Sequence, residues 1–198
     1  MTLNNVNGKD IIHNVNTELS DLLWKFSHEY VEQNKQKHGH LPLVDYDPLW
    51  ESKCQQGFFD DNTIHWLPAD AENNLLFDNV ENALNIHFHP DFKTYFTRFY
   101  SESLNAQCEE GQLSLLFAWN VDDFERLQEN IIGHVLMKQK LKQAITLFFA
   151  VTDEEDTILS IVNDTGEIWV ERVGCEPHKK VADSFASFIQ QLSPSTEV

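Results

Sequence analysis

The chain has 198 residues and a formal net charge of −18, from 32 acidic and 14 basic side chains. This length predicts one domain with a sizeable core, and a 12% share of aromatic residues excludes a disordered chain. The charge argues against nucleic acid and anionic lipid as partners and favours a basic protein surface, although surplus acid can also simply keep a protein dissolved.

The sequence carries no targeting or membrane-spanning signal. The first ten residues lack a basic region followed by an apolar stretch, and no apolar run is long enough to span a bilayer. Cys54, Cys108 and Cys175 are odd in number and widely spaced. We therefore expect a cytoplasmic protein with reduced thiols that does not insert into lipid.

The N-terminal part predicts one long helix and one irregular segment. Residues 1–15 are expected to form a flexible extension. Residues 16–39 predict a helix whose apolar side chains recur at helical spacing, with Gly39 just past its end. Proline and glycine punctuate residues 40–76, which predicts an irregular segment with one strand near residues 63–67.

Residues 77–194 predict a core of helices and strands. A hairpin turn that ends in Gly166 is expected to join the last two strands. Because these strands follow one another directly, the fold class is α+β, a single domain with a mainly antiparallel sheet flanked by helices. Helices are expected at 78–88, 90–100, from 120 onward and at 178–192, and strands at 111–119, 144–152, 157–163 and 166–173.

The helix that starts near residue 120 contains the stretch DDFERLQENIIGH, residues 122–134. Gly133 lowers helix stability, which predicts close packing against a neighbour or an early end to the helix. His134 is expected to border the buried face and to hydrogen-bond to the backbone. The apolar stripe expected to pack on the sheet consists of Phe124, Leu127, Ile131 and Val135.

Four carboxylates in this stretch raise the question of catalysis. Asp122 and Asp123 suit the first turn of a helix, where the helix dipole stabilises negative charge. Glu125 and Glu129 are four residues apart on the side away from the apolar stripe. A catalytic pair needs two carboxylates in different environments, so we expect no enzyme activity. Two interpretations stay open, a solvated face and a binding face.

We also expect no metal and no other cofactor. His38 and His40 form an H-x-H pair, as do His87 and His89, but no cysteine pair or H-E-x-x-H motif accompanies them. The sequence also lacks a glycine-rich phosphate loop and a G-x-S-x-G motif.

Most of the acid lies in two regions of the chain. Residues 43–91 hold ten acidic side chains and one basic, and residues 101–137 hold seven acidic and one basic. Segregation of this kind predicts a directional electric field and hence a partner-binding surface. The residues expected to form that surface are Asp60, Asp61, Asp70, Glu72, Asp78, Glu81, Asp122, Asp123, Glu125 and Glu129.

Several motifs together resemble one known family. DDFERLQENIIGH is followed by the basic run KQKLK and by TLFFA, and HWLPA, NVENAL, HPDF, LLFAWNVDDF, NDTGE and ADSFASFIQQLSP agree in order. In these motifs the chain resembles the Syd family, the SecY-interacting proteins of gamma-proteobacteria. The resemblance implies a fold of the SUKH superfamily, no enzyme activity, and a cytoplasmic protein held at the inner membrane through SecY, which it monitors or negatively regulates.

The resemblance also implies a partner for the acid. Cytoplasmic loops of membrane proteins carry excess Lys and Arg, so the acidic surface is expected to dock the basic loops of SecY. The alternative within the same superfamily is an immunity protein that neutralises a basic toxin. The oligomeric state stays open, with a monomer favoured.

Overall fold

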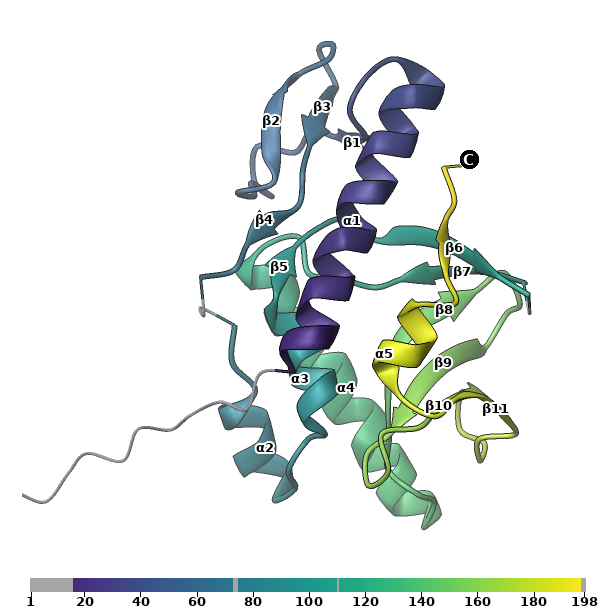
Figure 1. Ribbon diagram of the computed structural model, residues 1–198. Coiled ribbons are helices and arrows are strands. Elements are labelled where there is room, and N and C mark those ends of the chain that lie inside the picture. Colours follow the sequence, from purple (N-terminus) through teal and green to yellow (C-terminus); the bar gives the residue numbers. More distant parts are fainter. Residues whose placement is uncertain (1–15, 73–74, 110, 197–198) are drawn as a thin grey trace, which may run out of the picture.

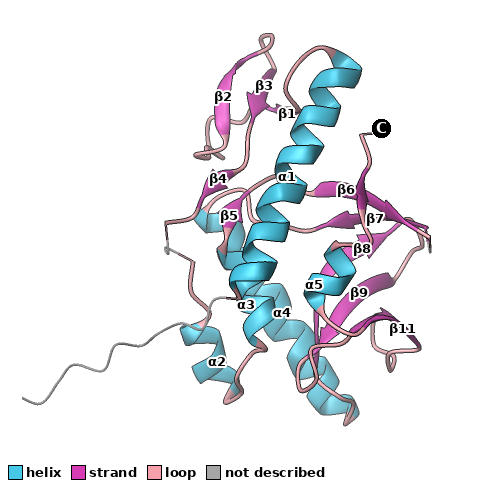
Figure 2. Cartoon of the chain, in the orientation of Figure 1, coloured by secondary structure: helices cyan, strands magenta, loops and turns pink. Residues whose placement is uncertain are grey.

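The computed structural model describes residues 16–72, 75–109 and 111–196. The extension expected at residues 1–15 therefore lies outside the described residues. Figures 1 and 2 show a large sheet with helices on both of its faces and a smaller group of strands at one end. The helices are α1 (Thr17–His38), α2 (Asp78–Leu84), α3 (Pro90–Thr97), α4 (Val121–Leu141) and α5 (Phe185–Ile189).

The large sheet has seven strands, and each neighbouring pair runs antiparallel. The hairpin turn expected before residue 167 is confirmed, because Ile168 pairs with Ile161 directly across it. The α+β fold class is confirmed as well. In spatial order the strands are β11 (Lys179–Ala182), β10 (Ile168–Arg172), β9 (Thr157–Val162), β8 (Thr146–Thr152), β7 (Gly111–Leu115), β6 (Leu104–Cys108) and β12 (Ser193–Pro194).

The sheet is covered on both faces. Successive residues of a strand point to opposite sides, and Thr146 and Phe148 of β8 contact His134 of α4. Phe149 instead contacts Phe185 of α5. The helix α4 therefore covers one face, while α1, α3 and α5 lie on the other, in front of the sheet in Figure 1.

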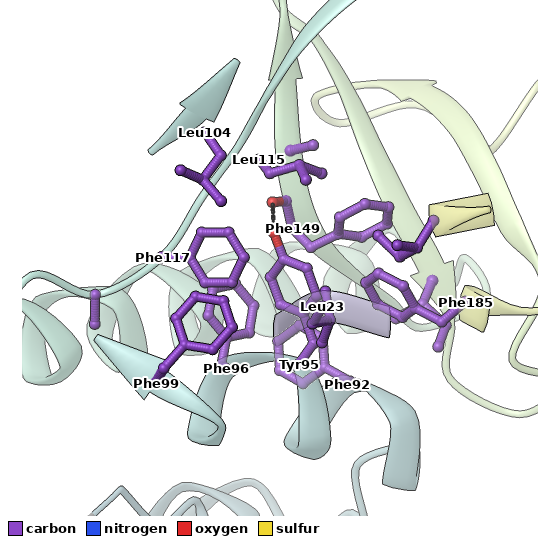
Figure 3. Close-up of a cluster of buried hydrophobic side chains, with 14 of the residues drawn as sticks. Leu23, Phe92, Tyr95, Phe96, Phe99, Leu104, Leu115, Phe117, Phe149 and Phe185 are labelled. Carbon is purple, nitrogen blue, oxygen red and sulfur yellow. Dashed lines mark hydrogen bonds between the residues drawn. The ribbon is translucent and has the colours of Figure 1, made fainter. Parts of the chain in front are cut away.

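Tyr95 of α3 lies at the centre of the core on the α1 side (Figure 3). Its ring stacks between Phe117 and Phe185, with ring centroids 4.8 Å away in each case. Its hydroxyl donates a hydrogen bond to the carbonyl oxygen of Phe149, 3.4 Å away. Burial raises the pKa of Tyr95 well above its ordinary value. The one polar group in this aromatic cluster thus has a partner.

The segment 40–76 contains more strand than its sequence predicts. The strand expected near residues 63–67 is confirmed, but two further strands pair with it. These strands are short and none of their residues is buried, so they lack the alternation by which strands are recognised in a sequence. The small sheet has the order β1 (Leu43–Asp45), β3 (Thr63–Trp66), β2 (Gln55–Phe58).

The helix expected at residues 178–192 is wrong in its first part. Lys179–Ala182 form β11, which extends the sheet beside β10. The helix begins only at Phe185, because Ser184 caps it and exchanges hydrogen bonds with Ser187 in a capping box. The apolar spacing fitted a helix, but the backbone of this stretch completes the edge of the sheet instead.

Two other helices are shorter than expected. α2 ends at Leu84 because Asn85 adopts a left-handed backbone conformation, with φ of 53°. α3 ends at Thr97, since Phe99–Tyr100 form β5 and pair with β4 (Ala69–Asp70). This pairing ties the end of the 40–76 segment to the core.

One of the four residues predicted for the buried stripe of α4 is only partly buried. Gln128 is buried where Leu127 was expected, and Leu127 is only partly buried. The amide of Gln128 donates to the carbonyl oxygen of Leu76, 2.6 Å away, and accepts from Asn79. A polar side chain is tolerated inside because its hydrogen bonds are made. The other members of the stripe, Phe124, Ile131 and Val135, are buried as predicted.

Both interpretations offered for Gly133 are wrong. A methyl group added at its Cα would meet nothing within 4 Å. The helix also continues well past it, to Leu141. Gly133 therefore neither packs closely against a neighbour nor ends the helix.

A fully buried ion pair joins α4 to the sheet. Lys138 and Glu171 have no exposed side-chain surface, and Nζ lies 2.5 Å from Oε2. Lys138 also donates to the carbonyl oxygen of Cys175, while Thr146 and Ser160 each donate to Oε1 of Glu171 at 2.7 Å. A buried charge is stable only when it is paired and hydrogen-bonded, and here every partner comes from a different element.

His134 joins this network through Thr146, with which it makes the expected backbone hydrogen bond and a contact to the side chain as well. Its Nε2 lies 3.0 Å from Oγ1 of Thr146. The single hydroxyl hydrogen of Thr146 goes to Glu171, so Nε2 of His134 carries the proton and donates it to Oγ1. Burial lowers the pKa of His134, which favours the neutral ring.

The burial difference along α4 gives a direct test of its orientation. Ile131→Ala should lower the free energy of unfolding by about 2–5 kcal/mol, because a fully buried methyl-rich side chain is lost. Leu127→Ala should cost clearly less, since Leu127 is only partly buried. Urea unfolding of the two variants measures both values. Equal losses would show that α4 is rotated relative to this structure.

The ion pair predicts a strong asymmetry between single and double substitution. Lys138→Met should lower the free energy of unfolding by roughly 3–5 kcal/mol, because Glu171 is left as an unpaired buried charge. Lys138→Met combined with Glu171→Leu should recover part of that loss. The exposed Lys140→Met on the same helix serves as the control and should unfold like the parent protein. If Lys138→Met is as stable as this control, the ion pair does not stabilise the packing of α4 on the sheet.

Candidate partner-binding surface

The side of α4 that faces water is opposite the side that packs on the sheet. With Lys138 and the apolar stripe turned toward the sheet, Asp122, Glu125 and Glu129 are exposed. The helix start is capped by Asn120, which accepts from the backbone N–H of Asp123. Asp123 in turn reaches back to accept from the N–H of Trp119 at 2.9 Å. Its carboxylate is therefore half-buried and oriented, unlike the other three.

The N-terminal half of α4 is bonded to two segments that precede it by many residues. Asn120 donates to the carbonyl oxygen of Glu51, and the indole of Trp119 donates to that of Trp50. Further along, Gln128 contacts the backbone just before α2 and the side chain of Asn79. The exposed Asp78, next to Asn79 at the start of α2, is thereby brought beside α4.

Three of the residues predicted for the partner-binding surface form ion pairs with basic residues of the same chain. Asp70 lies 2.7 Å from Arg98, and Glu72 lies 3.0 Å from Lys53. Glu81 is 9% exposed and accepts from the N–H of Phe88 and from Lys93. Asp70 and Glu72 stay at the surface with neighbouring cations, whereas Glu81 serves the interior.

The remaining predicted carboxylates form no ion pair within the ranges that the structure describes. Asp60 accepts from the backbone N–H groups of Asn62 and Thr63, which lowers its pKa. Asp60 and Asp61 lie in the turn between β2 and β3, at the opposite end of the molecule from α2 in Figure 1. We call the unpaired set the acidic edge: Asp60, Asp61, Asp78, Asp122, Asp123, Glu125 and Glu129.

This edge is extended and not one compact cluster. In Figure 1 the elements β2, β4 and α2 lie one below the other on one side of the molecule. The first turns of α4 are bonded to residues near two of these elements. The structure thus brings Asp78 and the α4 carboxylates together, and leaves Asp60 and Asp61 at a distance from them.

A pocket that the sequence analysis missed lies between α1 and the small sheet. Its volume is about 300 Å³. The C-terminal half of α1 forms one wall, β1 and β3 form another, and the residues just before β6 close it. The lining residues are Tyr30, Asn34, His38, His40, Pro42, Leu43, Trp66, Glu102 and Ser103.

Glu102 is the one acidic residue in this lining. Burial raises the pKa of Glu102, and the charge of nearby Asp123 raises it further, while the backbone N–H of Ser103 acts in the opposite direction. Burial and then the charge of Glu102 raise the pKa of Tyr30 as well. Glu102 therefore connects the pocket electrostatically to the first turn of α4. Nothing in the local sequence SESL sets this residue apart, so only its surroundings identify it.

The two H-x-H histidine pairs noted in the sequence lie in different parts of the structure. His38 and His40 line the pocket, with ring centroids 6.0 Å apart. His89 caps α3 through its own ring. Across residues 16–72, 75–109 and 111–196, no three side chains among His, Cys, Asp and Glu form a group able to hold a metal ion.

Comparison with known proteins defines the class and then the family. A family model described as Syd protein (SUKH-2) matches residues 20–194, so the α+β domain is of the SUKH type. The chain is 54% identical over 187 residues to Protein Syd of Colwellia psychrerythraea, which spans 90% of this chain and 94% of that protein. It is 46% identical to Protein Syd of Alteromonas mediterranea, over 89% and 96% of the two chains.

The chain belongs to the Syd family. A third relative, Protein Syd of Pseudoalteromonas atlantica, is 36% identical over 92% of this chain and 97% of that protein. Within the described part of the chain, none of the helices is long and apolar enough to cross a membrane.

The environment of Glu102 predicts a gain of stability when its charge is removed. A raised pKa in the folded state means that the contribution of Glu102 is fully favourable below its ordinary value of 4.5 and is lost as pH rises through the folded-state pKa. Glu102→Gln should therefore unfold at a higher temperature than the parent protein at pH 7. The difference should vanish below pH 4.5. Thermal unfolding across this range measures it, and a less stable variant at pH 7 would mean that the carboxylate supports the fold.

Proposed function

We propose that this protein is not an enzyme and that it binds the basic cytoplasmic loops of SecY through the acidic edge, and so monitors or restrains the translocon. The main support for the proposal is the difference between carboxylates that have a cationic partner and carboxylates that do not. Those of the acidic edge have no cationic partner among the described residues, although the chain pairs Asp70, Glu72 and Glu81. Carboxylates left without a counter-charge are available to a basic partner.

The arrangement along α4 favours binding over simple solvation. Glu125 and Glu129 are four residues apart on one exposed face, where like charges repel by a few tenths of a kcal/mol. Arg126 lies between them in sequence, but its guanidinium stacks on the ring of Trp50, 4.1 Å from the ring centroid. A basic loop laid along this face would relieve the repulsion.

The charge pattern also selects the kind of partner. Cytoplasmic loops of membrane proteins carry excess Lys and Arg, while the lipid surface beneath them is anionic and repels a protein with a charge of −18. Attachment to the inner membrane would then run through SecY and not through lipid. An extended edge suits this task, because it raises the encounter rate and sets the register of a loop.

The exposed carboxylates of α4 share one solvated environment, which does not favour acid–base catalysis. Glu125 and Glu129 are both exposed. The half-buried Asp123 is held by the backbone of Trp119 and does not face a histidine among its hydrogen-bond partners. These observations favour a binding protein.

A pair of charge reversals tests the edge as a docking surface. Asp78→Lys and Glu125→Lys should each weaken binding to SecY-containing membranes by roughly 0.2–1 kcal/mol, as exposed charges do, and together by at least the sum. The measurement is co-sedimentation at low and high salt, and binding should weaken as salt screens the charges over about 8–10 Å.

The matched control places the same charge change elsewhere. Glu109 and Glu155 are exposed and lie in the turns after β6 and β8, across the sheet from the edge in Figure 1. Glu109→Lys with Glu155→Lys should bind nearly as well as the parent protein. If the edge variant binds as tightly as this control at low salt, the acidic edge is not the docking surface.

A further inference from the structure

The end of the hairpin formed by β2 and β3 exposes two phenylalanine rings to water. Phe58 is 60% exposed and Phe59 is 51% exposed, and Leu49 in the loop before β2 reaches 89%. Among the large hydrophobic side chains that the structure describes, these three are the most exposed. Single exposed apolar residues are ordinary on a protein surface, whereas neighbouring ones mark a contact site. The two adjacent rings therefore indicate a surface that binds something.

The two rings are held in place by their neighbours. Phe58 packs against the edge of Tyr46, with ring centroids 4.7 Å apart. Phe59 contacts the rings of His40 and His65, with centroids 4.9 and 5.4 Å away. Each ring thus has one packed side, while about half of its surface stays open to water. A side chain that is already ordered loses little conformational freedom on binding, which favours affinity.

Backbone hydrogen bonds define the turn that follows the rings. Asp60 accepts from the N–H groups of Asn62 and Thr63, at 2.9 and 2.8 Å. The N–H of Phe59 donates to the carbonyl oxygen of Thr63 at 3.0 Å, and that of Tyr46 donates to Asn62 at 2.7 Å. These bonds give the end of the hairpin a defined shape. We call it the hairpin tip: Phe58, Phe59, Asp60 and Asp61.

Negative charge lies directly beside the rings of the hairpin tip. Asp60 and Asp61 follow the phenylalanines in the turn, and both are exposed. Between residues 40 and 72 the sequence has one lysine and no arginine. That residue, Lys53, is bonded to Glu72 at 3.0 Å. The hairpin tip therefore combines apolar surface with negative charge that its own segment does not neutralise.

This combination selects an occupant that is both basic and apolar. Anionic lipid would cover the rings, but the carboxylates repel it. A second copy of the chain would bring the same carboxylates and a net charge of −18 against them. A protein segment with apolar side chains between lysines and arginines meets both requirements. Its apolar groups cover the rings, and its cations reach the carboxylates at the rim of the contact.

We propose that the hairpin tip docks an apolar side chain of a basic protein segment, with Asp60 and Asp61 facing the lysines or arginines beside it. The inference rests on the proposed function for the identity of that segment, a loop of SecY, but not for the chemistry of the tip. It gives a role to two carboxylates that lie far from those of α4 (Figure 1). The partner is then held at two separate points, by charge along α4 and by apolar contact and charge at the tip.

Two short peptides with blocked ends test the hairpin tip without SecY. One alternates lysine and leucine, and the other has serine in place of each leucine. Binding is followed through the backbone amide signals of Phe58, Phe59 and Thr63 in nuclear magnetic resonance spectra of the full chain. We expect saturable shifts with the leucine peptide and binding at least roughly fivefold weaker with the serine peptide. Equal affinity for the two peptides, or no shift at these signals, overturns the proposal.

The same spectra test whether a second copy of the chain occupies the tip. Raising the protein concentration without peptide should leave the signals of Phe58 and Phe59 unchanged. Concentration-dependent shifts at these signals would identify self-association as the use of this surface, which overturns the proposal.

Substitutions then assign the contact to the rings. Phe58→Ser should weaken binding of the leucine peptide by roughly five- to twentyfold, the loss expected for about half of a phenylalanine side chain. Phe58→Leu keeps an apolar group and should retain most of the affinity, and Phe59→Ser repeats the test at the second ring. The control Leu136→Ser removes a leucine of α4 that is 50% exposed, and it should bind like the parent protein. Equal losses in Leu136→Ser and Phe58→Ser would show that exposed apolar surface in general attracts the peptide, which overturns the tip.

Binding to SecY-containing membranes separates this inference from the proposed function. The loss caused by Phe58→Ser should persist at high salt, because salt screens charges but not apolar burial. If the parent protein does not bind SecY, the proposed function fails, while the peptide titration still decides the chemistry of the tip. If SecY binds the parent protein and Phe58→Ser equally at low and high salt, the proposed function stands and the contact of the tip with SecY is overturned.

Discussion

The buried ion pair between Lys138 and Glu171 is the contact on which the arrangement of this molecule depends. It lies between α4 and β10, and hydroxyls from β8 and β9 complete it. Two charges inside a protein are tolerated only in one geometry, because each must keep its partner and its hydrogen bonds. Phe124, Ile131 and Val135 of α4 are buried as well, so apolar packing acts on the helix together with the ion pair. The ion pair and the buried apolar residues together favour one orientation of α4, in which Glu125 and Glu129 face water.

From this orientation follow three different environments for carboxylates. Glu171 is buried and paired, Glu125 is exposed and unpaired, and Glu102 is half-buried without a cation. Glu171 contributes to the structure, and Glu125 contributes to the electric field around the molecule. The third is unfavourable in the isolated chain, since burial opposes its charge.

The acidic edge and the pocket meet at the first turn of α4, where the charge of Asp123 acts on Glu102. Under the proposed function, the exposed charges would steer a basic loop toward this part of the surface, and salt would weaken that attraction.

The sequence by itself determined the features that depend on periodicity. The long helices α1 and α4, the strands β8, β9 and β10 and the hairpin turn before Glu167 all followed from the spacing of apolar residues and from local caps, because those signals lie within a few residues. The motifs also sufficed for the family. The sequence did not predict the short strands β1 and β2, none of whose residues is buried, or the edge strand β11, whose apolar spacing also fits a helix. Only the tertiary structure decided which single polar residues are buried and which are paired. Asp78 is exposed and Glu81, one helical turn later, is buried against Lys93. Lys138 is buried although it opens a basic run, and Gln128 replaces Leu127 inside. The physical reason is that the burial and pairing of a charge depend on groups contributed by distant segments, and no pattern within one segment encodes them.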